Sequence, residues 1–173
     1  DAGYKFLHLI NTGETTAAKK MIPGIETGLK KYSLPLTLRA VVHYNILALF
    51  FLDEDYSRMI PHLYSIVKMG EHRKDLQRIS RLLLILALHE DGKVETLEKQ
   101  IRSTRRYFKN DPELKEDGFI HTVFKYLREI TDLPDYEQKT PLTVFNNYLT
   151  QLKSNPDTRS LSGLDEFLLW ARS

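Results

Sequence analysis

Apolar residues recur every three to four positions along almost the whole chain, which is the spacing of one face of an α-helix. Leu76, Ile79, Leu83 and Leu86 follow this spacing within residues 73–89. No segment shows the sustained apolar–polar alternation that is typical of a half-buried β-strand. The pattern therefore predicts an all-α protein with about nine helices, over residues 4–10, 15–32, 36–52, 56–70, 73–89, 94–108, 114–130, 140–152 and 161–171.

Helix-breaking residues separate these predicted helices. Pro35 pushes the residue before it out of the α region, so the helix that precedes it must stop. The stretch Asp53-Glu54-Asp55 interrupts the chain between two apolar segments. The carboxylate of Asp55 is suited to accept the unpaired amides of the next helix, and Gly70 is a natural stop for that helix.

Two short sequences recur about 38 residues further along the chain, a period that is typical of helical repeat proteins. Met-Ile-Pro at 21–23 returns at 59–61, and the turn at 53–55 is followed by Glu90-Asp91-Gly92. We therefore expect helix pairs over 4–32, 36–70, 73–109 and 114–152, with a capping helix over 161–171. Stacked pairs bury each other's apolar faces. The expected architecture is a right-handed α-solenoid of antiparallel helix pairs that forms one domain over residues 1–173.

The helix over 36–52, the turn after it and the next helix carry a characteristic set of aromatic, leucine and small residues. They are Tyr44, Leu47, Ala48, Phe51, Asp55, Tyr56, Tyr64 and Val67. With these residues, the segment 36–109 resembles the tetratricopeptide repeat, a helix–turn–helix unit of about 34 residues. The sequence departs from the family at Ile60, where Ala is preferred, and at His72, where Pro is preferred. The resemblance implies a concave groove, lined by the first helix of each pair, that binds extended or helical peptide segments.

Polar residues on these first helices are the candidates for contact with such a partner. One asparagine interrupts an apolar stretch, two arginines lie three positions apart, and a histidine, a lysine and an arginine share one face of a later helix. Arginine recognises carboxylates by paired hydrogen bonds. The alternative is that the asparagine is satisfied by backbone groups and the cations are simply solvated. The candidate partner-binding residues are Asn45, Arg78, Arg81, His121, Lys125 and Arg128.

Charge is nearly balanced over the whole chain, with 25 Lys and Arg against 23 Asp and Glu. Residues 68–109 are basic and residues 110–173 are acidic, a polarity that can orient a charged partner. Arg102, Arg105 and Arg106 lie beside two aromatic residues, a combination that single-stranded nucleic acids can use. The nearby Glu95 and Glu98 weaken that field, so the sequence argues against nucleic acid and for a protein or peptide partner.

The sequence offers no constellation of catalytic or metal-binding residues. It has no Cys, and its six His lack the spacing of a helical zinc motif. No glycine-rich phosphate loop and no nucleophile elbow is present. We therefore expect no enzyme activity, no metal and no cofactor. The predicted function is a protein- or peptide-binding scaffold, and the alternative is a regulatory or sensor module whose output domain lies outside this chain.

The longest apolar run, at 82–88, is far shorter than the ~20 residues that cross a bilayer, so no membrane insertion is expected. The absence of Cys and of a charged-then-apolar leader favours a cytoplasmic location. The chain begins with Asp1, which indicates a fragment or a processed product. Phe167, Leu168, Leu169 and Trp170 either cap the array or form a homodimer through the C-terminal helix.

Overall fold

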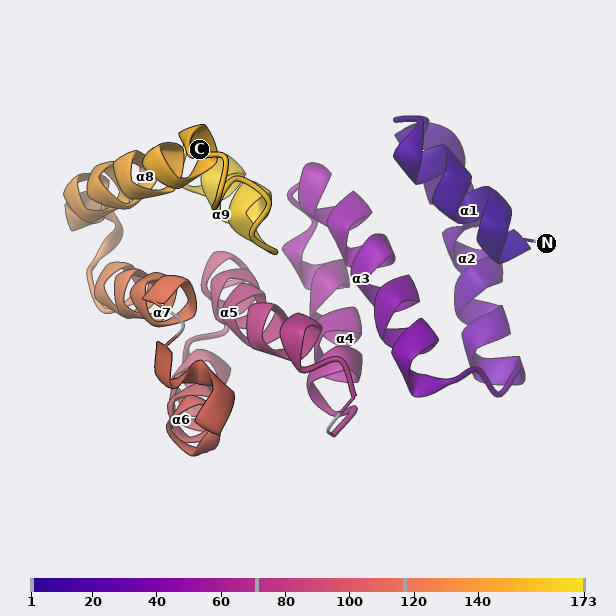
Figure 1. Cartoon of the computed structure of the whole chain (residues 1–173), viewed down its shortest axis with the longest axis horizontal. Coiled ribbons are helices and arrows are strands. Elements are labelled where there is room, and N and C mark those ends of the chain that lie inside the picture. Colours follow the sequence, from indigo (N-terminus) through magenta and orange to yellow (C-terminus); the bar gives the residue numbers. More distant parts are fainter. Residues whose placement is uncertain (1, 71, 117, 173) are drawn as a thin grey trace. The chain divides into compact units, whose positions relative to one another are not determined.

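The computed structural model describes residues 2–70, 72–116 and 118–172, and these residues form an all-α structure without strands (Figure 1). Nine α-helices account for most of it, joined by short turns and by two 3₁₀-helices, η1 (Pro112–Glu116) and η2 (Asp135–Glu137). The α-helices are α1 (Ala2–Asn11), α2 (Thr15–Lys31), α3 (Leu36–Leu52), α4 (Tyr56–Val67), α5 (Lys74–Glu90), α6 (Val94–Asn110), α7 (Gly118–Thr131), α8 (Lys139–Ser154) and α9 (Leu164–Trp170).

The predicted helices are confirmed, and most of their ends fall within two residues of the prediction. Three ends differ by more, and one of them is the start of the last helix, which was predicted at residue 161 and lies at Leu164. The helix predicted from residue 114 begins at Gly118, because Pro112–Glu116 form a 3₁₀-helix that follows an Asp111 carboxylate bonded to the amide of Glu113. The helix predicted to reach Gly70 ends at Val67. Asp55 caps the start of that helix as expected, since its side chain accepts a hydrogen bond from the Arg58 amide at 3.2 Å.

The same backbone turn joins the first three pairs of helices. Its central residue has a positive φ in each case: Gly13 (77°), Glu54 (54°) and Gly92 (67°). The amide of this residue bonds to the carbonyl three positions back, and the next amide bonds five positions back, as in Lys93 to Leu88 at 2.9 Å. This is the Schellman motif, which satisfies the last carbonyls of a helix and lets the next helix run antiparallel. The turns recur at intervals of roughly 40 residues, which is consistent with a helical repeat.

The Met-Ile-Pro sequence recurs without occupying equivalent helical positions. Pro23 lies about one helical turn further along α2 than Pro61 lies along α4. Met59 is fully buried whereas Met21 is only half-buried, so the two copies present different faces to the core. The three turns thus share one backbone geometry, whereas the two copies of the tripeptide do not occupy equivalent positions.

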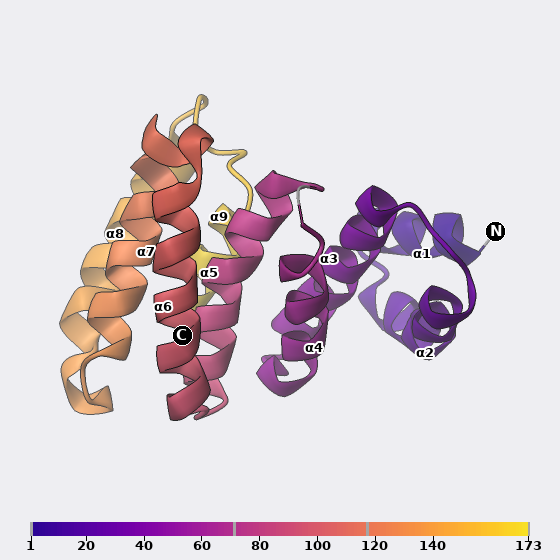
Figure 2. The same cartoon turned by 90° about the horizontal axis from the view of Figure 1, so that it is seen from below.

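The chain divides into two compact units, Asp1–Gln77 and Arg78–Ser173. The division falls inside α5. In the first unit, α1 packs on α2, α2 packs on α3, and α3 and α4 form the most extensive helix pair (Figure 2). Its core consists of large apolar side chains that are almost completely buried: Phe6, Ile22, Ile46, Leu47, Met59, Leu63 and Ile66.

The second unit is built around a helix that is buried over its whole circumference. Leu82–Leu88 of α5 are seven consecutive residues with at most 1% exposure. Contacts between consecutive elements continue from α5 through α6 and α7 to α8 and α9, which is consistent with a helical repeat. Phe145 of α8 lies at the centre of an aromatic cluster with Tyr126, Phe167 and Trp170.

The last helix, α9, returns to the first helix of its unit. The indole Nε1 of Trp170 donates a hydrogen bond of 2.7 Å to the carboxylate of Glu90, at the end of α5. Gly163, just before α9, adopts a left-handed conformation, and a Cβ placed there would lie 2.8 Å from Cγ2 of Ile79. α9 therefore covers more than the last helix pair, because it packs on both α8 and α5.

Three of the four residues expected to cap the array or to form a dimer are buried within this unit: Phe167, Leu168 and Trp170. Only Leu169 is exposed, at 49%. The structure thus accounts for this apolar segment by intramolecular packing. Among the described residues, no helix has both the length and the apolar character that crossing a bilayer requires.

Candidate functional site

Asn45 makes a local hydrogen bond within the first unit. Its Nδ2 donates to the backbone carbonyl of Val41, four positions earlier in α3, at 2.9 Å. The side chain is half-buried, so this bond satisfies a polar group in an otherwise apolar helix. The sequence analysis gave this as the alternative to partner binding, namely that a backbone group satisfies the Asn45 side chain.

Arg78 and Arg81 of the second unit are both held by α6 and the segment that follows it. The guanidinium of Arg78 forms ion pairs with Asp111 at 2.9 Å and Glu113 at 2.8 Å, and its side chain is only 14% exposed. The guanidinium of Arg81 lies 3.9 Å from the centre of the Tyr107 ring. Both arginines therefore connect α5 to its neighbours in the fold.

The three candidates on α7 have separate environments. His121 Nε2 lies 3.0 Å from the carbonyl of Leu114, so His121 and Arg78 both contact the connection between α6 and α7. The side chain of Lys125 is exposed. Arg128 lies 5.9 Å from the centre of the Phe124 ring. Their use by a partner remains a prediction.

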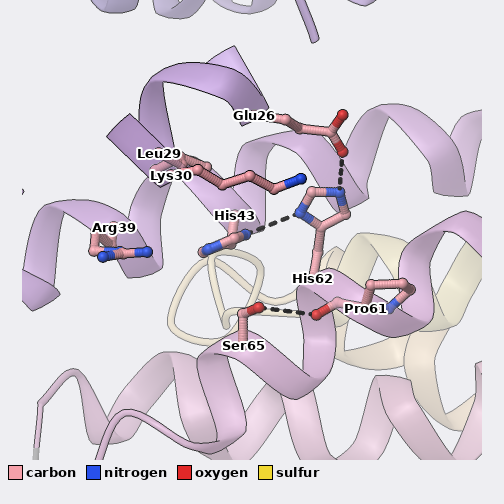
Figure 3. Close-up of a pocket in the computed structure, with 8 residues that line it drawn as sticks. All are labelled: Glu26, Leu29, Lys30, Arg39, His43, Pro61, His62 and Ser65. Carbon is pink, nitrogen blue, oxygen red and sulfur yellow. Dashed lines mark hydrogen bonds and ion pairs between the residues drawn. The ribbon is translucent and has the colours of Figure 1, made fainter. Parts of the chain in front are cut away.

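The first unit contains a chain of three polar side chains, from three helices, that the sequence analysis did not identify (Figure 3). Nδ1 of His43 in α3 lies 2.9 Å from Nδ1 of His62 in α4. Nε2 of His62 lies 3.1 Å from Oε1 of Glu26 in α2. Both histidines are buried, with exposures of 9% and 6%. The two buried imidazoles can share a proton, and the Glu26 carboxylate holds the His62 ring in place.

The chemistry of the partners fixes the direction of these hydrogen bonds. A carboxylate only accepts, so Nε2 of His62 carries a proton and donates it to Glu26. A neutral His62 has no second proton, so its Nδ1 accepts from Nδ1–H of His43. His43 is then left with an unprotonated Nε2, which faces away from His62 on the side of Arg39 in Figure 3.

Burial keeps this pair neutral at physiological pH. It lowers the pKa of His43 from 6.5 to about 4, and the charges of His62 and Arg39 act in the same direction. Burial also lowers the pKa of His62, while the adjacent Glu26 raises it and the charge of Arg58 lowers it further. The first proton taken up by the pair is thus stabilised best on His62, beside the Glu26 carboxylate.

The His43–His62 pair opens into a pocket of about 300 Å³, which we call the polar pocket. Lys30 and Arg39 both line it. In the view of Figure 3, Arg39 lies on the side of His43 away from His62, and the Lys30 side chain passes above His43 towards His62. Within the part of the chain that the structure describes, no carboxylate forms an ion pair with either cation. The remaining lining residues are Glu26, Leu29, Pro61 and Ser65.

A second and larger pocket lies next to the polar pocket, because Leu29 lines both. It has a volume of about 520 Å³ and is walled by apolar residues of α1, α2 and α3, and we call it the apolar groove. Two glycines four positions apart, Gly24 and Gly28, leave one face of α2 without side chains. The other lining residues are Ala2, Gly3, Tyr4, Phe6, Leu7, Ile25, Leu29, Tyr32, Leu34, Leu38 and Val42.

The sequence did contain a signal for the polar pocket. His43 interrupts the same apolar stretch of α3 as Asn45, and it lies on the buried side of that helix. A titratable residue on a core-facing position requires a partner. The partners His62 and Glu26, however, lie on other helices at no characteristic spacing, so only the tertiary structure brings the three together.

Glu26, His43 and His62 are not arranged to hold a metal ion, and no other group of three potential ligands is so arranged among the described residues. Comparisons with protein families, with curated proteins and with solved structures found no match to this chain. The geometry of the two pockets is therefore the basis for the proposed function.

Proposed function

We propose that the protein is a binding scaffold and that the apolar groove of the first unit holds an apolar side chain of a protein or peptide partner. One observation carries this proposal: α1, α2 and α3 leave a hollow of about 520 Å³ that their own side chains do not fill. A hollow of this size accommodates one or two large apolar side chains, and covering it removes apolar surface from water.

The margin of the groove supports a protein partner. Tyr4 and Tyr32 both line the groove while remaining 78% and 58% exposed. Exposed tyrosines are enriched at protein interfaces because they combine a large apolar face with a hydroxyl group. Leu38, which is 44% exposed, extends the apolar margin along α3. The adjacent cations Lys30 and Arg39 favour a partner segment that is acidic next to its apolar residue.

The experiment is selection from a displayed library of random peptides, with the full chain as the target. Wild-type protein is expected to enrich peptides that share a large apolar residue. The variant Gly28→Leu places a side chain in the groove, and the Cβ at this position meets only Tyr32 at 3.9 Å. Leucine also favours the helix over glycine by roughly 0.8–1 kcal/mol, so the variant is expected to fold.

The matched control is Gly118→Leu, because Gly118 is a helical glycine with open space around its Cβ position and lies in α7 of the second unit. Enriched peptides are expected to lose at least about tenfold in affinity for Gly28→Leu and to bind Gly118→Leu as they bind the wild type. Selection that enriches no peptide, or peptides that bind both variants equally well, would overturn the proposal.

A further inference from the structure

The polar pocket carries a second, independent inference, which concerns its unpaired positive charge. Lys30 and Arg39 bring two cations into a pocket in which Glu26 is the only carboxylate among the lining residues. That carboxylate already accepts a hydrogen bond from His62. The positive charge that faces the remaining space is therefore not neutralised by the fold, and a partly enclosed cationic pocket attracts an anion.

The His43–His62 pair adds a donor that depends on protonation. In the neutral pair, Nε2 of His43 has no proton and would repel an anion. When a proton binds to this Nε2, the proton on Nδ1 of His43 can pass to Nδ1 of His62. The result is a neutral His43 with an Nε2–H group and a His62 imidazolium next to Glu26, so that one proton has been added and none lost.

We propose that the polar pocket binds an oxyanion, a carboxylate or phosphate group, between Arg39, Lys30 and Nε2–H of His43, and that binding is accompanied by the uptake of one proton by the His43–His62 pair. Arg39 supplies paired donors on a planar fork, and Lys30 supplies a flexible point charge. The bound anion stabilises the protonated pair, and the protonated pair in turn supplies the third donor.

The charged groups around the pair set the direction of the pH dependence. Lys30, Arg39 and Arg58 surround the pair with positive charge from α2, α3 and α4, and Glu26 is its one close carboxylate. In the free protein, burial and the charges of Arg39 and Arg58 oppose protonation of the pair. An anion in the pocket offsets the cations, so the affinity for anions rises as the pH falls.

The test is an NMR titration of the full chain with sulfate and, separately, with acetate, at constant ionic strength. Sulfate represents a phosphate group and keeps its charge across the pH range used. Saturable shifts of the His43 and His62 imidazole signals are expected with at least one ion. Tighter binding of sulfate would identify a phosphate-like ligand and tighter binding of acetate a carboxylate, and both results support an oxyanion site.

Two further measurements separate a specific site from general attraction. Sulfate is expected to bind about tenfold more weakly near pH 7.5 than near pH 5.5, because one proton must be taken up. Imidazole ¹⁵N shifts are expected to move His43 from the Nδ1–H to the Nε2–H tautomer when sulfate binds. The exchange His43→Gln removes Nε2 of His43, the nitrogen that takes up the proton. In this variant the affinity for sulfate is expected to change by less than about threefold between pH 5.5 and pH 7.5.

The variant Arg39→Gln is expected to weaken sulfate binding by about tenfold at both pH values. Lys31→Gln is the matched control, because Lys31 is an exposed cation that neighbours Lys30 and does not line the pocket. It is expected to change the affinity by less than about twofold. Shifts that fail to saturate with both ions, or that are equal in Arg39→Gln and the wild type, would overturn the proposal. The outcome is independent of peptide binding in the apolar groove.

Discussion

The two units use similar helix pairs but complete their packing in different ways. In the second unit, α9 places Phe167 and Trp170 against α8 and α5, and aromatic contacts fill the space between these helices. In the first unit, α1, α2 and α3 leave the apolar groove open, and α2, α3 and α4 surround a pocket with two buried histidines. The first unit thus retains two open pockets, and this difference is the reason that we place the proposed binding surface there.

The largest effect that we predict is for Phe167→Ala in the second unit. Phe167 is completely buried against Phe145, so truncation removes apolar contacts and leaves a cavity. The free energy of unfolding of this unit should fall by about 3–5 kcal/mol. Urea unfolding can be followed by the fluorescence of Trp170, the only tryptophan in the chain. The neighbouring exposed residue provides the control: Leu169→Ala should cost less than about 0.5 kcal/mol.

A smaller loss of stability is expected for Gly163→Ala, because this substitution disturbs the packing of the α9 region on α5. Gly163 has a φ of +81°, and an added Cβ would lie 2.8 Å from Ile79. Left-handed strain and this overlap together should destabilise the second unit by about 3 kcal/mol. Gly92→Ala also adds left-handed strain, at a φ of +67°, but its Cβ meets open space. Gly92→Ala should therefore lower the free energy of unfolding by only about 1 kcal/mol. Equal losses of stability in the two variants would contradict the packing of α9 on α5.

Acid should destabilise the first unit selectively. The pKa of His43 is about 4 in the folded protein against 6.5 in the unfolded chain, so the unfolded state binds more protons between these values. This contribution to stability is complete above about pH 6.5 and is lost as the pH falls towards 4, which should cost about 3 kcal/mol. Urea unfolding followed by NMR signals of α3 measures it. In His43→Gln the pH dependence in this window should shrink, whereas an unchanged profile would show that another group is responsible.

The smallest predicted effect concerns the turn that both units share. Glu54 occupies the left-handed position that glycine holds at residues 13 and 92. Replacing it with glycine removes the strain on its Cβ, so Glu54→Gly should stabilise the first unit by about 1 kcal/mol. Thermal unfolding monitored by circular dichroism would detect the gain. A loss of stability would mean that the Glu54 side chain makes a contribution beyond the turn.

The sequence predicted local structure well because local interactions determine it. The apolar spacing located the helices, and Asp55 was identified as a cap because it precedes an apolar segment at the right distance. The polar pocket and the apolar groove depend instead on which helices pack together. Gly24 and Gly28 line a groove only because α1 and α3 stand beside that face of α2. His43 and Glu26 become informative only when His62 lies between them.

Tertiary contacts also account for two of the residues that the sequence singles out, Asn45 and Arg78, while the use of the six candidates by a partner stays a prediction. Asn45 and Arg78 were conspicuous because they are polar on helices that should be buried. The fold provides each with a partner, the Val41 carbonyl for Asn45 and the carboxylates of Asp111 and Glu113 for Arg78. Lys30 and Arg39, for which the described residues provide no ion-pair partner, lie near helix ends, where a charged residue attracts no attention in a sequence.

The central claim is that the first unit presents the binding surface, and NMR mapping of a peptide enriched by the selection tests it most directly. The account predicts that backbone amide shifts on titration of the full chain concentrate at Gly24, Gly28 and Leu38, around the apolar groove. Shifts concentrated on α5 and α7 of the second unit, with the groove amides unchanged, would contradict it.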